Sequence, residues 1–169
     1  VFTGSYPYAP FIVGKLSDAI HINKLNSKLY YMPKHEALGQ FNAEFGDELY
    51  LFEEHPTEGN LILEDKNFTG NIYSTYNVFE KIHANENQTI DEKEFIKARL
   101  FDMLIGDWDR HQDQWRWLEF KENDKIVFKP LPRDRDQAFS IMSDGFMLGA
   151  AVELIPLAKI LRKYDNDLE

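Results

Sequence analysis

The chain has 169 residues, of which 43% are hydrophobic and 14% aromatic, so it can bury a real core as one domain or one large lobe. Its 29 acidic and 19 basic residues give a net charge of −10, which argues against nonspecific binding to nucleic acid or to anionic membranes. The absence of cysteine excludes a disulfide framework, a thiol nucleophile and a cysteine-ligated zinc. No apolar run reaches the roughly 18 residues of a membrane span.

The first part of the chain is predicted to mix helix and strand. Pro10–Ile20 has the apolar spacing of a helix, and Lys28–Met32 and Glu48–Phe52 are predicted as short strands. Pro, Gly, Asn and charged residues then accumulate from His55 to Gly70, which is typical of a loop. Because the chain starts at Val1 with a helix close behind, we expect it to be a piece of a longer protein with adjacent domains.

Two helices are expected after this loop. Ser74–His83 is predicted as a helix, and a second helix is predicted to start at Thr89, which has capping-box spacing to Glu92. The second helix should run to Ile105 and stop at Gly106, because glycine readily adopts the left-handed conformation that ends helices. A last helix is expected over residues 148–164.

An acidic loop follows Gly106, and after it the pattern predicts a β-hairpin. Trp115–Lys121 and Lys125–Leu131 are the expected strands, joined by a turn centred near Asn123. Opposed residues in such a hairpin have numbers that sum to about 246, which places Gln112 roughly opposite Asp134. The loop before the hairpin and the segment after it should therefore meet.

Several oxygen-bearing side chains would gather where these two segments meet. Asp109, Asp113 and Gln114 lie before the hairpin, and Asp134 and Asp136 follow it. Carboxylates held so close repel one another unless a hard cation such as Mg²⁺ or Mn²⁺ lies between them, and such cations suit phosphate substrates. Taken alone, each Asp next to an Arg would be interpreted as a surface ion pair of small energetic value. The hairpin geometry favours a metal site instead.

The order of helix, acidic loop, hairpin and second acidic segment resembles the catalytic core of atypical kinases. The loop Asp-Arg-His-x-Asp-Gln is similar to the catalytic loop of phosphatidylinositol 3-kinases, and Gly-x-x-Asp-Arg-His is similar to that of secretory-pathway kinases. Pro-Arg-Asp-Arg-Asp-Gln-Ala-Phe resembles the Asp-x-Asp segment of CotH-type kinases. Most of the chain also resembles a segment of Bacteroidetes cell-envelope proteins that lies between a metallophosphoesterase domain and an outer-membrane barrel.

This resemblance implies a role for each candidate residue. Asp109 would orient or accept the proton of the attacking hydroxyl, and Arg110 and His111 would hold the loop or contact phosphate. The implied metal ligands are Asp134, Asp136, Gln114 and Asp113, of which Gln114 stands where the kinases have asparagine.

The resemblance also implies a hinge next to the nucleotide. On this interpretation Glu53 and Glu54 belong to a hinge that would meet the purine of ATP or of another nucleotide. Two departures from the kinase pattern stand out: no Gly-rich loop with a following lysine precedes Pro10, and the amide of Gln114 carries one methylene more than asparagine. We expect the loop and the lysine upstream of this chain.

These observations predict an α+β fold, a helix-rich kinase-like C-lobe with part of an N-lobe. Residues 1–56 would form the end of the N-lobe, and residues 57–169 the C-lobe with its acidic loop and hairpin. The predicted function is metal-dependent phosphoryl transfer from a nucleotide to an unknown hydroxyl acceptor, without nucleic acid and without a membrane span. The alternatives are a non-catalytic, pseudokinase-like module that binds or links partners, and a metal-dependent phosphoesterase. By resemblance the parent protein belongs to the cell envelope.

Overall fold

The computed structural model describes residues 6–57, 63 and 65–140, and over these residues the fold is mixed α and β, as predicted. A two-stranded sheet pairs β1 with β2, and a four-stranded sheet has the order β3-β5-β6-β4. The helix expected over residues 148–164 lies outside the described residues. None of the described helices is long and apolar enough to cross a membrane.

The predicted hairpin forms the middle of the four-stranded sheet. Strands β5 (Trp115–Glu122) and β6 (Lys125–Pro132) are antiparallel, and Trp115 pairs with Pro132. Asn123 makes the turn with a φ of 57°, a left-handed conformation that asparagine tolerates better than most residues. The register therefore differs by a single residue from the one that the sequence predicts.

The two outer strands of this sheet were not predicted. Strand β3 (Phe68–Ser74) pairs antiparallel with β5, and it includes the last three residues of the predicted loop from His55 to Gly70. Strand β4 (Gln88–Ile90) pairs in parallel with β6. Both strands are short or irregular, since β4 has three residues and the pairing of β3 shifts register between Phe68 and Ile72.

Helix α3 (Thr75–Ala84) agrees with the prediction within one residue, and the Ser74 hydroxyl caps it by accepting the N–H of Asn77. Helix α4 (Glu92–Ile105) ends as predicted at Gly106, which has a φ of 66°. The predicted cap at Thr89 is wrong because Thr89 lies in β4. Asp91 caps α4 instead, and its Oδ1 accepts the N–H of Glu94 at 3.1 Å.

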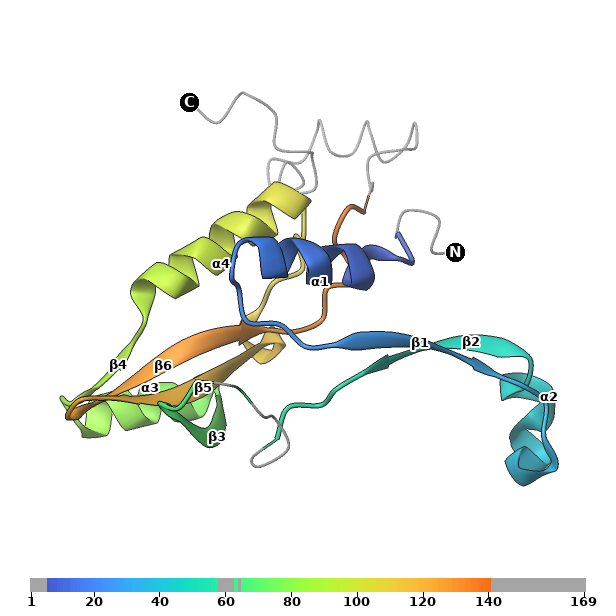
Figure 1. Ribbon diagram of the computed structural model, residues 1–169, viewed down its shortest axis with the longest axis horizontal. Coiled ribbons are helices and arrows are strands. Elements are labelled where there is room, and N and C mark those ends of the chain that lie inside the picture. Colours follow the sequence, from blue (N-terminus) through green and yellow to red (C-terminus); the bar gives the residue numbers. More distant parts are fainter. Residues whose placement is uncertain (1–5, 58–62, 64, 141–169) are drawn as a thin grey trace, which may run out of the picture.

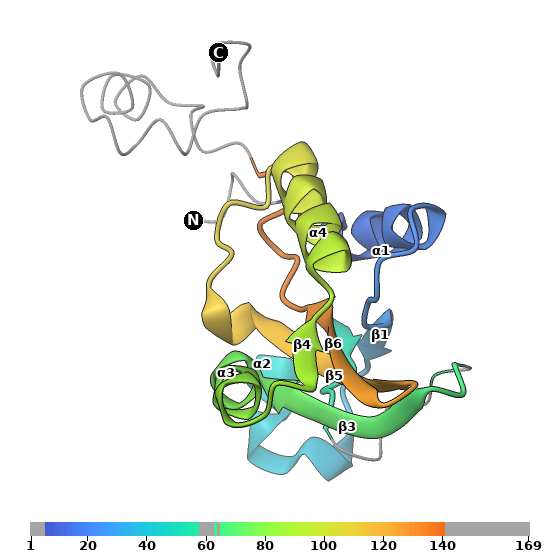
Figure 2. The same cartoon turned by 90° about the vertical axis from the view of Figure 1, so that its left-hand side faces the viewer.

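The helices pack on the tryptophan-bearing side of the sheet. Trp115 and Trp117 alternate along β5 and are buried, and Phe95 of α4 packs against both rings at centroid distances of 5.1 and 5.6 Å. Helix α1 (Ala9–Ala19), predicted over Pro10–Ile20, buries Val13 in the same core. In Figures 1 and 2, α1 and α4 lie together above the strands, whereas α3 lies lower. A second cluster contains Leu25, Ile72, Leu118, Phe120 and Leu131.

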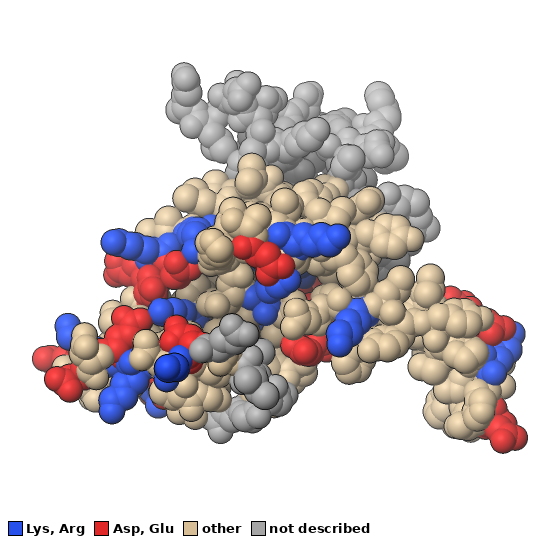
Figure 3. Space-filling model, in the orientation of Figure 1, with Lys and Arg blue, Asp and Glu red and all other residues tan. Residues whose placement is uncertain are grey.

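The two-stranded sheet projects from this body as an arm (Figure 1). We call residues 27–53 the arm. It consists of β1 (Ser27–Met32) and β2 (Glu48–Glu53), both predicted, with a 3-10 helix (Glu36–Phe41) and the short α2 (Asn42–Phe45) at its tip. Its strands leave apolar side chains exposed on both faces, and few charged groups lie along its middle in Figure 3. The large exposed apolar residues of the strands are Leu29, Tyr30, Tyr31, Met32, Leu49, Leu51 and Phe52.

Candidate functional site

The acidic loop and the segment after the hairpin meet at Gln114. The N–H of Arg133 donates to the backbone oxygen of Gln114 at 2.8 Å, which continues the pairing of the hairpin by one step. The side-chain Nε2 of Gln114 lies 3.4 Å from Oδ2 of Asp134. Gln114 is only 6% exposed, and its Oε1 has no hydrogen-bond partner. A buried amide oxygen without a partner can accept a hydrogen bond from water or bind a cation.

Asp134 and Asp136 present their carboxylates together at the surface beside this amide. Burial is the largest cause of a raised pKa at Asp134, and the neighbouring Asp136 raises it further, whereas Arg110 and Gln114 act in the opposite direction. Asp134 has a φ of 53°, in the left-handed region that non-glycine residues rarely adopt. Two carboxylates at one place suit Mg²⁺ or Mn²⁺, which prefer oxygen ligands.

Beneath these groups lies a buried network of two carboxylates and two guanidiniums. We call Asp102, Asp107, Arg110 and Arg135 the ion network. Their side chains are at most 8% exposed. Arg110 donates to Oδ2 of Asp102 at 3.2 Å and also bonds Asp107, and Arg135 donates to Oδ1 of Asp102 and to Oδ2 of Asp107. Burial raises the pKa of Asp107, and the two guanidiniums act against this shift.

Arg110 connects the ion network to the backbone of the site. Its Nη1 donates to the carbonyl oxygen of Arg133 and lies 3.5 Å from that of Gln114. The structure therefore places Arg110 where it holds the loop, and its side chain is only 1% exposed. Among the described residues, the buried side-chain atoms that lack a hydrogen-bond partner concentrate here, in Asp107, Gln114, Arg133 and Arg135. Such atoms are rare in folded proteins and mark places where a ligand, ion or water can bind.

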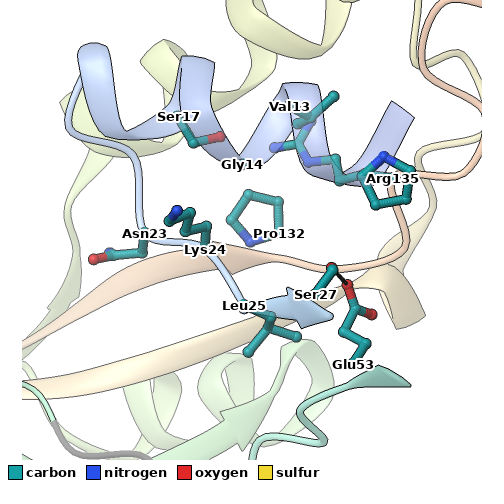
Figure 4. A pocket seen from close by; sticks show the side chains of 11 residues that line it. Val13, Gly14, Ser17, Asn23, Lys24, Leu25, Ser27, Glu53, Pro132 and Arg135 are labelled. Carbon is teal, nitrogen blue, oxygen red and sulfur yellow. Dashed lines mark hydrogen bonds between the residues drawn. The ribbon is translucent and has the colours of Figure 1, made fainter. Parts of the chain in front are cut away.

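The base of the arm lies next to the same segment. The hydroxyl of Ser27 donates to Oε1 of Glu53 at 3.1 Å, and burial raises the pKa of Glu53, with Asp134 and Asp136 adding to the shift. Glu53 and Arg135 both line a cavity of about 20 Å³ between α1 and β6 (Figure 4). A cavity of this size holds a water molecule or one terminal group of a ligand, but no nucleotide base.

The other predicted site residues lie at the surface near this centre. Asp109 and Glu54 are exposed. His111 is exposed too, and its ring is the cap of the short 3-10 turn Gln112–Gln114, where Nδ1 lies 3.4 Å from the N–H of Asp113. Asp113 points toward His111 at 3.9 Å and is 82% exposed. Within the described part of the chain, no group of three or more His, Asp or Glu side chains could hold a metal.

Sequence reasoning did not single out Asp102, and it did not give Arg135 a buried role. Asp102 could have been found, because it lies four residues after Ala98 and three before Ile105 on the buried face of α4. A carboxylate at such a position needs cationic partners. The partners of Arg135 could not have been found, since they lie 28 and 33 residues away in sequence.

Comparison with family models, curated proteins and solved structures finds no match for this chain. The kinase-like interpretation of the site therefore depends on the residues and their geometry.

Proposed function

We propose that this chain carries a metal-dependent phosphoryl-transfer site in which Asp134, Asp136 and Gln114 hold Mg²⁺ or Mn²⁺. The unpartnered Oε1 of the buried Gln114, whose Nε2 lies 3.4 Å from Oδ2 of Asp134, is the observation that carries the proposal. The raised pKa of Asp134 supports it, since a carboxylate that is costly to ionise gains from a cation. The carboxylate of Asp113 lies 3.9 Å from Nδ1 of His111 and is 82% exposed, so we leave it outside the ligand set.

A divalent cation at this place would neutralise the charge of a nucleotide's phosphates. Asp109 would act on the acceptor, because its exposed carboxylate can reach a hydroxyl that arrives from solvent. In the transfer, the acceptor oxygen bonds to the terminal phosphorus while the bond to the bridging oxygen breaks. The hydroxyl proton goes to Asp109, and the nucleoside diphosphate leaves. Arg110 holds the loop from below, and the exposed ring of His111 would contact phosphate from the surface.

The proposal is tested by titrating the chain with ATP in the presence of Mn²⁺ in a calorimeter. We expect binding that needs metal and nucleotide together and that disappears in Asp134→Ala. Asp124→Ala removes the same charge from the exposed hairpin turn and is the matched control, which should bind as the wild type does. Equal binding by both variants, or no binding by the wild type, would refute the proposal.

Chemistry is tested separately with Asp109→Asn. This exposed residue should be dispensable for folding and for Mn²⁺–ATP binding, whereas transfer of the terminal phosphoryl group should fall at least a hundredfold, the scale of a lost general base. A variant that keeps full transfer activity would show that Asp109 is not the base.

The exposed apolar arm favours a second candidate function, a non-catalytic module that binds or links partners. On that account the metal site would be absent, and neither Mn²⁺ nor ATP would change the stability of the chain. A phosphoesterase is the third possibility. It would release phosphate from an ester without any nucleotide, so the same preparation distinguishes it by the substrate that it turns over.

A further inference from the structure

We infer that Asp102 is a positioning residue for the candidate site, acting through Arg110 and Arg135 to set where Gln114, Asp134 and Asp136 stand. This inference deepens the proposed function and depends on it for its functional consequence, although the positioning itself can be measured without any ligand. Asp102 lies on α4 and contacts none of the three proposed metal ligands in any hydrogen bond of the described structure.

The two carboxylate oxygens of Asp102 accept hydrogen bonds from different arginines. Oδ1 accepts from Nη1 of Arg135, and Oδ2 accepts from Nε of Arg110 at 3.2 Å and from Nη1 of Arg99 at 2.9 Å. Asp102 is 1% exposed, so these bonds form away from water, where a charged hydrogen bond is strong and an unpaired charge is costly. These bonds fix the side chains of Arg110 and Arg135 relative to helix α4, which carries Asp102.

Each arginine in turn fixes one side of Asp134. Arg110 donates to the carbonyl oxygen of Arg133, the residue immediately before Asp134. Arg135, the residue immediately after Asp134, points inward to Asp102 and Asp107. Arg135 is buried, whereas Asp134 and Asp136 on either side of it are exposed, so anchoring the Arg135 side chain inward leaves both carboxylates at the surface. The left-handed φ of 53° at Asp134 is then maintained from both sides.

Two control variants separate positioning of the site from a general loss of stability. Arg99 also bonds Asp102 but is 40% exposed and makes no hydrogen bond to the site segments, so Arg99→Gln should leave the site unchanged. Val78 of α3 is 1% exposed in the main core and lies outside the ion network, so Val78→Ala lowers global stability without touching the site.

The test is amide hydrogen exchange by NMR in the metal-free chain, comparing two hydrogen-bonded amides. The N–H of Arg133 donates to Gln114 within the site, and the N–H of Ile126 donates to the carbonyl oxygen of Asn87 at the far end of the hairpin, at 2.9 Å. In Asp102→Asn we expect exchange at Arg133 to accelerate at least tenfold relative to Ile126. In Val78→Ala exchange at both amides should accelerate by the same factor. In Arg99→Gln the ratio of the two exchange rates should stay as in the wild type.

Equal acceleration of both amides in Asp102→Asn would overturn the inference, and so would an unchanged Arg133. Should Asp102→Asn not fold, Arg110→Lys keeps the positive charge but loses the guanidinium's simultaneous reach to Asp102 and to the Arg133 carbonyl. The same selective acceleration is expected there. If neither variant folds, the ion network is a requirement of the whole fold and the positioning role is refuted.

Mn²⁺ affinity then gives the functional consequence. We expect it to fall at least tenfold in Asp102→Asn and to stay unchanged in Val78→Ala at a temperature where both variants are folded. If the wild type binds no Mn²⁺, the proposed function fails, and the exchange experiment still decides whether Asp102 positions the segment.

Discussion

Replacing Asp134 with asparagine should have opposite effects with and without metal. The pKa of Asp134 is raised from its ordinary value of 3.8 by burial and by Asp136, so its ionised form is disfavoured in the folded chain. Asparagine has the same shape, cannot ionise and still accepts from Gln114. At pH 7 and without metal, Asp134→Asn should therefore be more stable than the wild type. The gain should stay within about 0.2–1 kcal/mol, since Asp134 is only partly buried and water screens its charge.

With Mn²⁺ the order of stability should reverse. A ligand that binds only the folded state at a concentration one hundred times its dissociation constant stabilises that state by about 2.7 kcal/mol. For a chain of 169 residues this corresponds to a rise in melting temperature of about 5–10 °C. The wild type should show this rise, and Asp134→Asn, which lacks one of the two carboxylates, should lose most of it.

The assay is thermal unfolding followed by circular dichroism, for both proteins, in a chelator and in a Mn²⁺ series. We expect Asp134→Asn to have the higher melting temperature in the chelator and the wild type to have the higher one at saturating Mn²⁺. A less stable Asp134→Asn in the chelator would show that the carboxylate is satisfied without metal, and an equal Mn²⁺ response would show that it is no ligand. Either result would refute the reasoning.

Three further predictions concern the pH dependence, the helix cap and the arm. Because the pKa of Glu53 is raised, the folded chain binds the proton of Glu53 more tightly than the unfolded chain does. The free energy of unfolding should therefore decrease as pH rises above 4.5. Urea titrations should show a smaller decrease in Glu53→Gln, and an equal decrease would contradict the assignment. Asp91→Ala should cost about 1 kcal/mol of stability and Thr89→Ala less than about 0.5, and the reverse order would restore the cap at Thr89. Phe52 on the arm is 60% exposed, so Phe52→Ser should change the free energy of unfolding by less than about 0.5 kcal/mol. The same variant should bind less of an apolar dye. A loss near the roughly 3–5 kcal/mol of a buried phenylalanine would mean that the arm is packed.

Much of the fold follows from local patterns in the sequence. The hairpin was predictable because alternating aromatic residues on β5 and the turn residue Asn123 fix its two strands and give its register to within one residue. Strand β4 was not predicted because three residues are too few to show the alternation of apolar and polar side chains that marks a strand. Its pairing with β6 also joins residues far apart in the sequence. Thr89 was mistaken for a cap because it has capping-box spacing to Glu92, whereas the β4 pairing moves the start of the helix to Asp91.

The site was predictable only in part. The hairpin alone brings Gln114 to Asp134, so their proximity could be predicted from turn geometry. The inward turn of Arg135 depends on Asp102 of α4, which the sequence presents as an ordinary charged residue of a helix. The proximity of Glu53 to Asp134 depends on how the arm joins the body, and its predicted role at a nucleotide hinge stays a prediction.

The proposed metal site is tested most directly by paramagnetic broadening in the ¹H–¹⁵N spectrum of the chain. Substoichiometric Mn²⁺ should broaden the side-chain amide of Gln114 and the backbone amides of residues 134–136 first. The amide of Asp124, in the hairpin turn at the far end of the strands, should stay sharp at the same concentration. Broadening centred on any other acidic cluster, or uniform broadening of all exposed acidic residues, would contradict a metal site at Gln114, Asp134 and Asp136.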